Sequence, residues 1–481
     1  MTDLRNEKLT YDDLNYPTFV NTHDAVSLTI QEAGKEEQTP ITLPASDIPK
    51  VVEIIGGHLF APGDTRTGKS QLISDIHRNH FGGSADDGGK SNWIPTGNSF
   101  TSEGYFMTLD QSKIGEGKGM LNESRVPVKA RIGALCNMLD EVNLTIPEVQ
   151  PEYFGIGENR HKDIPLGKDG YCLCMATCNL NKVNGDFAGA SQLNRALLNR
   201  FGIGLDIDYY HATDEDKNEV NRRMATGTLK LAPIRDISEK ILGAYEEINK
   251  RAGESEPYLD AYLRFFSSGL AFCSKDKDSR KKKVWPMKCG ECDFQKDNLE
   301  SRVCHLAKHS NQGTLEGIKR FAVGMKYLVE LKHGEDVQVN PFELALESFK
   351  FTTYHGNLNQ IETMSTYGGE DQEHMEEVVS RLRKSIEPYT NYINSCIESA
   401  LKGNAEIRFI QMGDTYEIYS EEIEEKLKAL SKGSPKKSKI TYTIAEPFKN
   451  LNGKSFEDAT GLSIGWFKGY LEFISKVNKG K

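Results

Sequence analysis

The sequence predicts an α/β protein with a parallel sheet at its centre. From Val51 to about Tyr210, short apolar runs alternate with helical patterns, which is typical of repeated β–α–β units. The expected strands include 57–61, 134–139 and 171–177. At 481 residues the chain is too long for one ordinary domain, so two to four domains are expected.

The most specific motif is the loop 63–70, Gly-Asp-Thr-Arg-Thr-Gly-Lys-Ser, which matches G-x-x-x-x-G-K-[ST]. An apolar run precedes it and a helical pattern follows, and this context argues against the alternative of a chance match in a loop. Such a loop turns backbone N–H groups toward phosphates, while its lysine meets the β and γ phosphates. The residues expected to bind ATP and Mg²⁺ are Gly63, Thr65, Thr67, Gly68, Lys69 and Ser70.

A second apolar run ends in two carboxylates, Asp140 and Glu141. Taken alone, a solvated strand end is the better interpretation. About 70 residues beyond a phosphate-binding loop, however, the pair is typical of a hydrolytic site. Asp140 would then orient a water on Mg²⁺, and Glu141 would act as the base that polarises the attacking water.

Two further polar residues follow later apolar segments. Asn179 ends the expected strand 171–177, where an amide can hold the attacking water near the γ-phosphate; a turn-forming asparagine is the alternative. The segment 193–201 is expected to form a short helix that presents Arg195 and Arg200. An arginine at such a helix end can serve a neighbouring subunit as an arginine finger, and two surface arginines are the alternative.

The order of these motifs resembles the MoxR-type AAA+ ATPases and the wider dynein-related, RavA-like group. The matching segments are the loop 63–70, Leu-Asp-Glu-Val-Asn at 139–143, Pro-Glu-Val-Gln at 147–150, Ala-Thr-x-Asn at 176–179 and Leu-Asn-Arg-Phe at 198–201. The resemblance covers about 50–235 and resumes in a lid from Ser310 to Asn357. It implies a P-loop AAA+ core with a five-stranded parallel sheet, a helical lid and ring assembly, usually hexameric.

The same resemblance implies roles for individual residues and partners. Asn179 corresponds to the first sensor residue and Arg200 to the finger. A chaperone-like role is implied, often with a von Willebrand A-domain partner. The sequence departs from the family at 310–313, where Ser-Asn-Gln-Gly replaces a lid motif that usually begins Ser-x-Arg. It also carries a Cys/His segment that the family normally lacks.

That segment has the spacing C-x₂-C-x₁₂-H-x₃-H, formed by Cys289, Cys292, His305 and His309. The spacing predicts a structural Zn²⁺ site resembling a zinc finger, with reduced cysteines that bind no metal as the alternative. The basic run 280–283 lies nearby, but Asp276 and Asp278 interrupt the patch. A zinc-stapled structural insertion is therefore favoured over nucleic-acid contact.

The predicted organisation has four parts. Residues 1–50 form a flanking arm that packs on a neighbour or stays mobile, and 51–235 form the nucleotide-binding domain. A helical lid spans 236–368, with the Cys/His insertion at about 274–310, and 369–481 form a small α+β domain. The chain has no apolar run long enough for a transmembrane helix and no signal-peptide pattern, so a cytoplasmic protein without membrane partners is expected.

The preferred functional hypothesis is a ring-forming ATPase that remodels a protein client. Its alternative is an AAA+ nucleic-acid motor or loader that uses the Cys/His segment. A net charge of −10 argues against a chain that coats nucleic acid over its whole surface, although a local patch can still bind. A third hypothesis, an ATP-binding scaffold with little hydrolysis, is disfavoured because Glu141, Asn179 and Arg200 are all present.

Overall fold

The computed structural model places most of the chain in two compact units. The described residues are 7–109, 125–179, 193–227, 232–271, 303, 306–307, 310, 312–352, 357–403, 410–412, 415–417, 456 and 462–479. Unit 1 comprises Met1–Glu254, Arg320–Asn340 and Phe351–Gly356, and unit 2 comprises Ser255–Lys319, Pro341–Lys350 and Asn357–Lys481. Segments far apart in the sequence therefore fold together within each unit.

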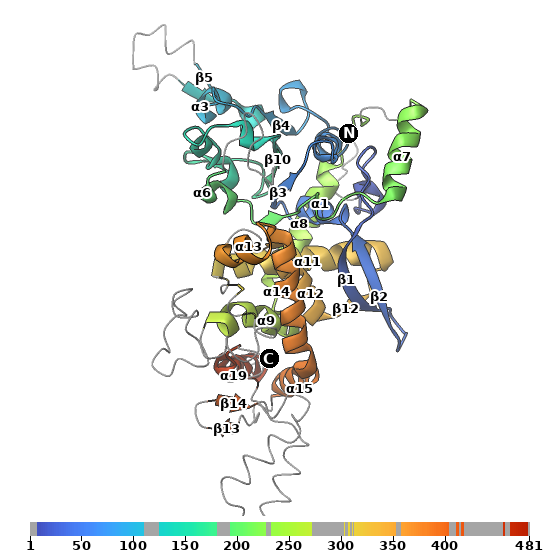
Figure 1. The fold of residues 1–481 in the computed structure, drawn as a ribbon, viewed down its shortest axis with the longest axis vertical. Helices are drawn as coiled ribbons and strands as arrows, with labels where there is room; N and C mark the ends of the chain where they lie inside the picture. The colour runs from blue at the N-terminus through green and yellow to red at the C-terminus, as the bar shows by residue number, and fades with distance from the viewer. Residues whose placement is uncertain are drawn as a thin grey trace, which may run out of the picture. The chain divides into compact units, whose positions relative to one another are not determined.

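Among the described residues of unit 1, five parallel strands form a central sheet (Figure 1). They are β3 (His58–Gly63), β4 (Ser91–Ile94), β7 (Cys136–Leu139), β10 (Leu173–Asn179) and β11 (Ile203–Gly204). Their spatial order is β11-β3-β10-β7-β4. Because β10 lies between β3 and β7, the carboxyl ends of these three strands meet at one edge of the sheet. The predicted five-stranded parallel sheet is confirmed.

The strand sequences suit a sheet that is covered on both faces. All four residues of β7 are buried, as are all residues of β10 except the last. Strands that are buried on both faces of a sheet have nearly continuous apolar sequences. For this reason the apolar runs in the sequence indicated β7 and β10. On one face, Phe60, Leu139 and Phe201 join a single hydrophobic cluster.

Unit 1 also contains helices. They are α1 (Asp47–Ile54), α2 (Lys69–Asp75), α3 (Ser102–Phe106), α5 (Lys129–Ile132), α6 (Arg195–Leu198), α7 (Asp214–Ala225) and α8 (Ser238–Gly253). All eight residues of α1 are buried, and α8 packs against it. Residues 320–333 of α11 (Gln312–His333) also approach α1 closely, since a Cβ on Gly324 would lie 2.4 Å from Ile55 Cγ2. Only glycine fits there.

The described part of residues 1–50, for which the sequence predicts a flanking arm, belongs to unit 1 and forms strands. Strands β1 (Asp24–Gln31) and β2 (Gln38–Pro44) form an antiparallel hairpin, to which β12 (Gln338–Val339) adds a third strand. Val26, Leu28 and Ile30 alternate inward along β1 and are buried. This period of two was present in the sequence but was hidden by the turn residues around it.

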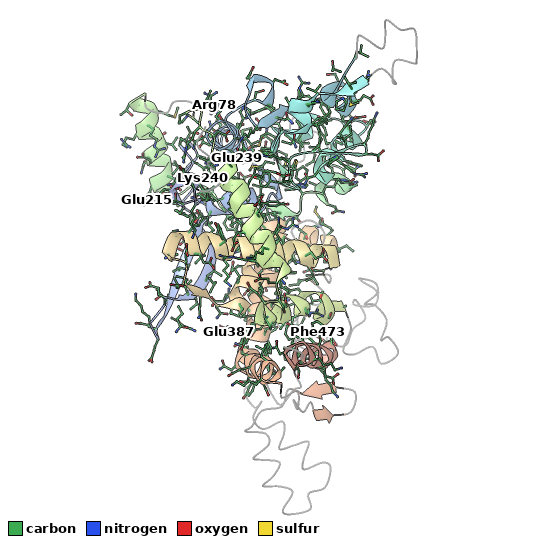
Figure 2. The ribbon with its side chains drawn as sticks, turned by 180° about the vertical axis from the view of Figure 1, so that it is seen from behind. Arg78, Glu215, Glu239, Lys240, Glu387 and Phe473 are labelled. Atoms are coloured by element: carbon green, nitrogen blue, oxygen red, sulfur yellow. The ribbon has the colours of Figure 1, made fainter. Side chains whose placement is uncertain are left out.

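The segment that precedes the hairpin is fixed to unit 1 by buried or half-buried acids. Backbone N–H groups of Thr18 and Phe19 both donate to Asp75 Oδ2 at 2.8 Å. Lys240, which Figure 2 labels on α8, lies 3.2 Å from Asp13 Oδ2. Such contacts are long-range and carry no sequence signature, so the arm's docking could not be predicted.

Two short antiparallel hairpins complete the described strands of unit 1. They are β5 (Met107–Leu109) with β6 (Arg125–Pro127), and β8 (Arg160–His161) with β9 (Ile164–Pro165).

Unit 2 is mainly helical. Its elements are α9 (Pro257–Arg264), the start of α11, most of α12 (Pro341–Thr352), α13 (Gln360–Thr366), α14 (Asp371–Ile386), α15 (Thr390–Leu401), α19 (Gly465–Lys479) and the hairpin β13 (Ile410–Met412) with β14 (Thr415–Glu417). Its core is aromatic: Phe265 packs on Trp466 with ring centroids 4.9 Å apart, and Phe266 on Phe349 at 4.6 Å. Helices α14 and α15 are separate, because the turn Glu387–Tyr389, which contains Pro388, lies between them.

Candidate active site

The loop 63–70 connects β3 to α2 at the carboxyl edge of the sheet. Gly68 has φ +91°, a conformation that favours glycine. Thr67 Oγ1 donates to the Asp64 carbonyl at 2.9 Å, and the Thr65 N–H donates to Asp64 Oδ1 at 2.6 Å. A Cβ on Gly63 would lie 3.1 Å from Thr67 Oγ1, so the loop closes tightly on its first residue. This is the strand–loop–helix geometry that the motif requires.

The lysine of the loop is folded onto the loop itself. Lys69 is 5 % exposed, and its Nζ donates to the Gly63 carbonyl at 2.8 Å and to the Asp64 carbonyl. Burial lowers the pKa of Lys69, while nearby carboxylates, Asp208 first among them, oppose that shift. A phosphate group would offer this desolvated ammonium a stronger acceptor than the two carbonyls do.

Asp140 follows β7 and is held by three elements at once. Its Oδ2 accepts from Ser70 Oγ at 3.2 Å, and its Oδ1 accepts from Thr177 Oγ1 at 2.6 Å. Its backbone carbonyl accepts from Thr96 Oγ1 at 2.6 Å. The carboxylate is therefore oriented with one oxygen toward the first turn of α2.

Glu141 and Asn179 meet across the tips of β7 and β10. Asn179 Nδ2 donates to Glu141 Oε1 at 2.9 Å. Asn179 is also the register partner of Gly63, the first residue of the phosphate-binding loop. The sheet order thus brings the predicted residues Lys69, Ser70, Asp140, Glu141 and Asn179 to one edge.

Arg200 lies elsewhere in the same unit. Its carbonyl is 3.1 Å from His58 Nδ1, at the amino end of β3, whereas the phosphate-binding loop follows the carboxyl end. Six residues of strand separate these ends by about 16 Å. The guanidinium bonds to Glu158 Oε1 through Nε at 2.9 Å and Nη2 at 2.6 Å, and it stacks on Phe154 at 4.2 Å. Arg200 does not join the residues at the loop.

The sequence did not assign a role to three residues that lie at this edge: Asp208, Thr177 and Asn143. Asp208 Oδ1 accepts from the Asp64 N–H at 2.7 Å, because the chain after β11 continues alongside β3 as far as the Ile207–Pro62 hydrogen bond of 3.0 Å. Thr177 and Asn143 both touch the tips of β7 and β10. These two lie inside motifs already recognised, so only their roles were missed; Asp208 had no motif to mark it.

The oxygens of this edge fit Mg²⁺. Ser70 Oγ and Asp140 Oδ2 lie 3.2 Å apart beside the phosphate-binding loop, and hydroxyl and carboxylate oxygens are the ligands that Mg²⁺ prefers. The predicted zinc ligands Cys289, Cys292, His305 and His309 lie outside the described residues. Within the described part of the chain, no group of three or more His, Cys, Asp or Glu side chains could hold a metal ion. The zinc site stays a prediction from spacing.

Together, the sheet order and the loop define the class of the protein: unit 1 contains an α/β core with a five-stranded parallel sheet and a phosphate-binding loop between β3 and α2. The comparison with solved structures finds a similarity to the crystal structure of a putative ATPase from Cytophaga hutchinsonii. The two share 15 % sequence identity over 70 % of this chain and 88 % of that chain, with a TM-score of 0.46. No protein-family profile and no curated protein match the sequence. In the described part of the chain, no helix is both long and apolar enough to span a membrane.

Proposed function

We propose that this protein is an Mg²⁺-dependent, ATP-hydrolysing AAA+ ATPase. The observation that carries the proposal is the meeting of the phosphate-binding loop with Asp140, Glu141 and Asn179 at one sheet edge. In this scheme Lys69 leaves the loop carbonyls for the β and γ phosphates of ATP. Mg²⁺, when bound, would supply positive charge to those phosphates.

The chain's own residues then divide the work of hydrolysis. Ser70 and Asp140 would hold the ion, and the loop N–H groups would bind phosphate oxygens. Glu141 would accept the proton of the attacking water. Asn179 would orient that water, and its amide already lies 2.9 Å from the Glu141 carboxylate. The developing charge on the γ-phosphoryl group still requires an additional cation.

Arg200 is proposed to supply that cation to a neighbouring copy of the chain. Its place near the amino end of β3 argues against service to its own site. We therefore propose a ring of identical subunits, by resemblance a hexamer, in which each site is completed by the next subunit. The MoxR-like resemblance further suggests that the ring remodels or matures a protein client, with a von Willebrand A-domain protein as a candidate partner.

The test compares the wild-type protein with Glu141→Gln. The amide cannot accept the water's proton, so turnover should fall by about 10²–10⁴-fold. Because Lys69 and the loop are untouched, equilibrium affinity for ATP should be unchanged, and assembled, ATP-loaded protein should accumulate. The measurements are phosphate release and binding of a fluorescent ATP analogue. Wild-type turnover in Glu141→Gln would refute the assignment of the base.

A further inference from the structure

Two side-chain bridges join the tips of β7 and β10 beyond the end of their backbone pairing. The β7–β10 register stops at the Leu139–Ala176 pair, one residue before Asp140. Past that point Thr177 Oγ1 donates to Asp140 Oδ1 at 2.6 Å and accepts from the Glu141 N–H at 3.0 Å. Side chains thus continue the connection that the backbone has ended.

The second bridge is made by Asn143. Its Nδ2 donates to the Asn179 carbonyl at 2.7 Å, and its Oδ1 lies 3.3 Å from the Asn179 N–H. The side chain therefore pairs with the backbone of Asn179 much as a neighbouring strand would. Asn143 is itself 3 % exposed, so water competes little for these bonds.

The turn between the bridges has an unusual backbone. Glu141 has φ +53° and ψ +51°, the left-handed region that residues other than glycine adopt rarely. Such a conformation persists only where its surroundings hold it in place. The Thr177 bond to the Glu141 N–H and the Asn143 bonds flank this turn on either side.

We propose that Thr177 and Asn143 are positioning residues for hydrolysis. A hydroxyl has a single proton to donate, and Thr177 donates it to Asp140 Oδ1. The other oxygen, Oδ2, accepts from Ser70. Thr177 thereby sets the orientation of the carboxylate that would meet Mg²⁺. Thr177 and Asn143 together hold the left-handed turn from which Glu141 reaches Asn179. This inference rests on the proposed ATPase function.

The two bridges should have separable effects. Thr177 bonds to Asp140 and to the Glu141 N–H. Its loss should therefore weaken both the Mg²⁺-dependent gain in ATP affinity and the placement of Glu141. Asn143 bonds to the backbone of Asn179 and not to Asp140, so its loss should leave the Mg²⁺ dependence of ATP binding intact. Partners that orient metal ligands typically account for about 10–100-fold in metal affinity or activity.

The experiment uses the full-length protein with Thr177→Val, Thr177→Ser and Asn143→Ala. Valine keeps the shape of threonine but has no hydroxyl, and serine keeps the hydroxyl. Two quantities are measured for each: the gain in affinity for a fluorescent ATP analogue as Mg²⁺ is added, and kcat with KM for ATP. Affinity in the absence of Mg²⁺ is the internal control, since the hydrogen bonds of Lys69 go to Gly63, Asp64 and Thr67 and not to Thr177 or Asn143.

Thr177→Val should need about 10–100 times more Mg²⁺ for the same gain in affinity, and its kcat should fall by a similar factor. Thr177→Ser should restore both, and Asn143→Ala should lose kcat while keeping the wild-type Mg²⁺ response. The inference is overturned if Thr177→Val keeps the wild-type Mg²⁺ response and kcat. It is also overturned if Thr177→Val and Thr177→Ser lose Mg²⁺-free affinity alike, which would indicate only a structural role.

If Thr177→Val does not fold, Asn143→Ala provides the test. An unchanged kcat in Asn143→Ala would contradict the proposal that the turn at Glu141 must be held in place for hydrolysis. Absence of hydrolysis in the wild-type protein would instead defeat the proposed function. The two failures are therefore distinguishable.

Discussion

The two ends of strand β3 differ in what they hold. At its carboxyl end, Gly63 opens a loop whose partners are backbone groups, hydroxyls and carboxylates that surround the buried ammonium of Lys69. At its amino end, His58 contacts the carbonyl of Arg200, whose side chain is one-quarter exposed and pairs with Glu158. One end is arranged to receive phosphate and a cation, and the other presents a cation of its own.

Under the proposed function, this difference explains why a single chain is an incomplete enzyme. The strand separates the two ends by about 16 Å. Arg200 is also held in place by Phe154 beneath it and by Gly157, where a Cβ would lie 2.9 Å from Arg200 Cβ. A local side-chain rotation cannot bring it to its own phosphate-binding loop. A second copy of the chain can bring an Arg200 there.

The largest effect is expected from mixing two inactive variants. Arg200→Ala should bind ATP normally but hydrolyse it about 10³–10⁵-fold more slowly, because the transition-state charge loses its stabiliser. Lys69→Ala should lose ATP binding. In a mixed ring, a Lys69→Ala subunit offers an intact Arg200 to the intact loop of an Arg200→Ala neighbour, so turnover should partly recover. Phosphate release from mixed and unmixed samples is the measurement.

The controls for this experiment are concentration and composition. Wild-type turnover per chain should rise with protein concentration, since sites become complete only when subunits meet. Differently tagged variants, recovered together, establish that the rings are mixed. If turnover does not recover in rings shown to be mixed, Arg200 does not act on the ATP site of a neighbouring subunit. The amino end of β3 would then have no role in hydrolysis.

A smaller effect is expected from Glu158→Gln. Glu158 holds Arg200 through Oε1 and Arg160 through Oε2, so its loss frees the guanidinium to sample other rotamers. Turnover at limiting protein concentration should fall by about two- to fivefold, the scale of a partly exposed ion pair. A rise in turnover would contradict this prediction, because it would mean that Glu158 competes with phosphate for Arg200.

The pH dependence of that effect follows from the pKa of Glu158. Hydrogen bonds from Arg160 and then Arg200 lower this pKa, so the carboxylate stays charged below its ordinary range. The ion pair is present above that range and is lost only as the pH falls through the lowered pKa. The difference between wild type and Glu158→Gln should therefore be equal at about pH 5.5 and pH 7.5. Glu103→Gln is the matched control, since Glu103 pairs with Lys162 and Arg125 rather than with Arg200.

Local sequence was sufficient to predict the features that depend on residues close to one another in the chain. Strands β3, β7 and β10 were located because buried parallel strands are continuous apolar runs, and the loop 63–70 because its glycines and lysine have a fixed spacing. Strands β4 and β11 were not among the named strands. The convergence of β3, β7 and β10 followed from the rule that parallel strands end at one edge. Asp140, Glu141 and Asn179 were each proposed from their position at the end of an apolar run.

The remaining features depend on residues that are distant in sequence. Asp208 reaches the Asp64 N–H across 144 positions, and Phe19 packs on Gly68 from a segment interpreted as a separate arm. Pairing of β1 with β12 likewise joins residues 338–339 to the first strand. No local pattern encodes such contacts. The left-handed backbone of Glu141 also has no sequence signal, because glutamate rarely adopts it.

The smallest effect on the ATP site is expected from removing the predicted zinc ligands. The spacing of Cys289, Cys292, His305 and His309 predicts about one Zn²⁺ per chain. Cys289→Ser with Cys292→Ser should release the ion, and the segment around it should lose stability because a short insertion of this kind cannot build a core of its own.

The same double variant should bind ATP as the wild type does. Among the described residues, every contact found at the carboxyl end of β3 is made by residues of unit 1, from Phe19 to Asp208. Elemental analysis and limited proteolysis test the metal and its local effect, and binding of a fluorescent ATP analogue tests the site. Zinc-free protein straight from purification would end the zinc hypothesis. Loss of ATP affinity on zinc removal would show instead that the segment supports the carboxyl end of β3. ATP binding would then need residues outside unit 1.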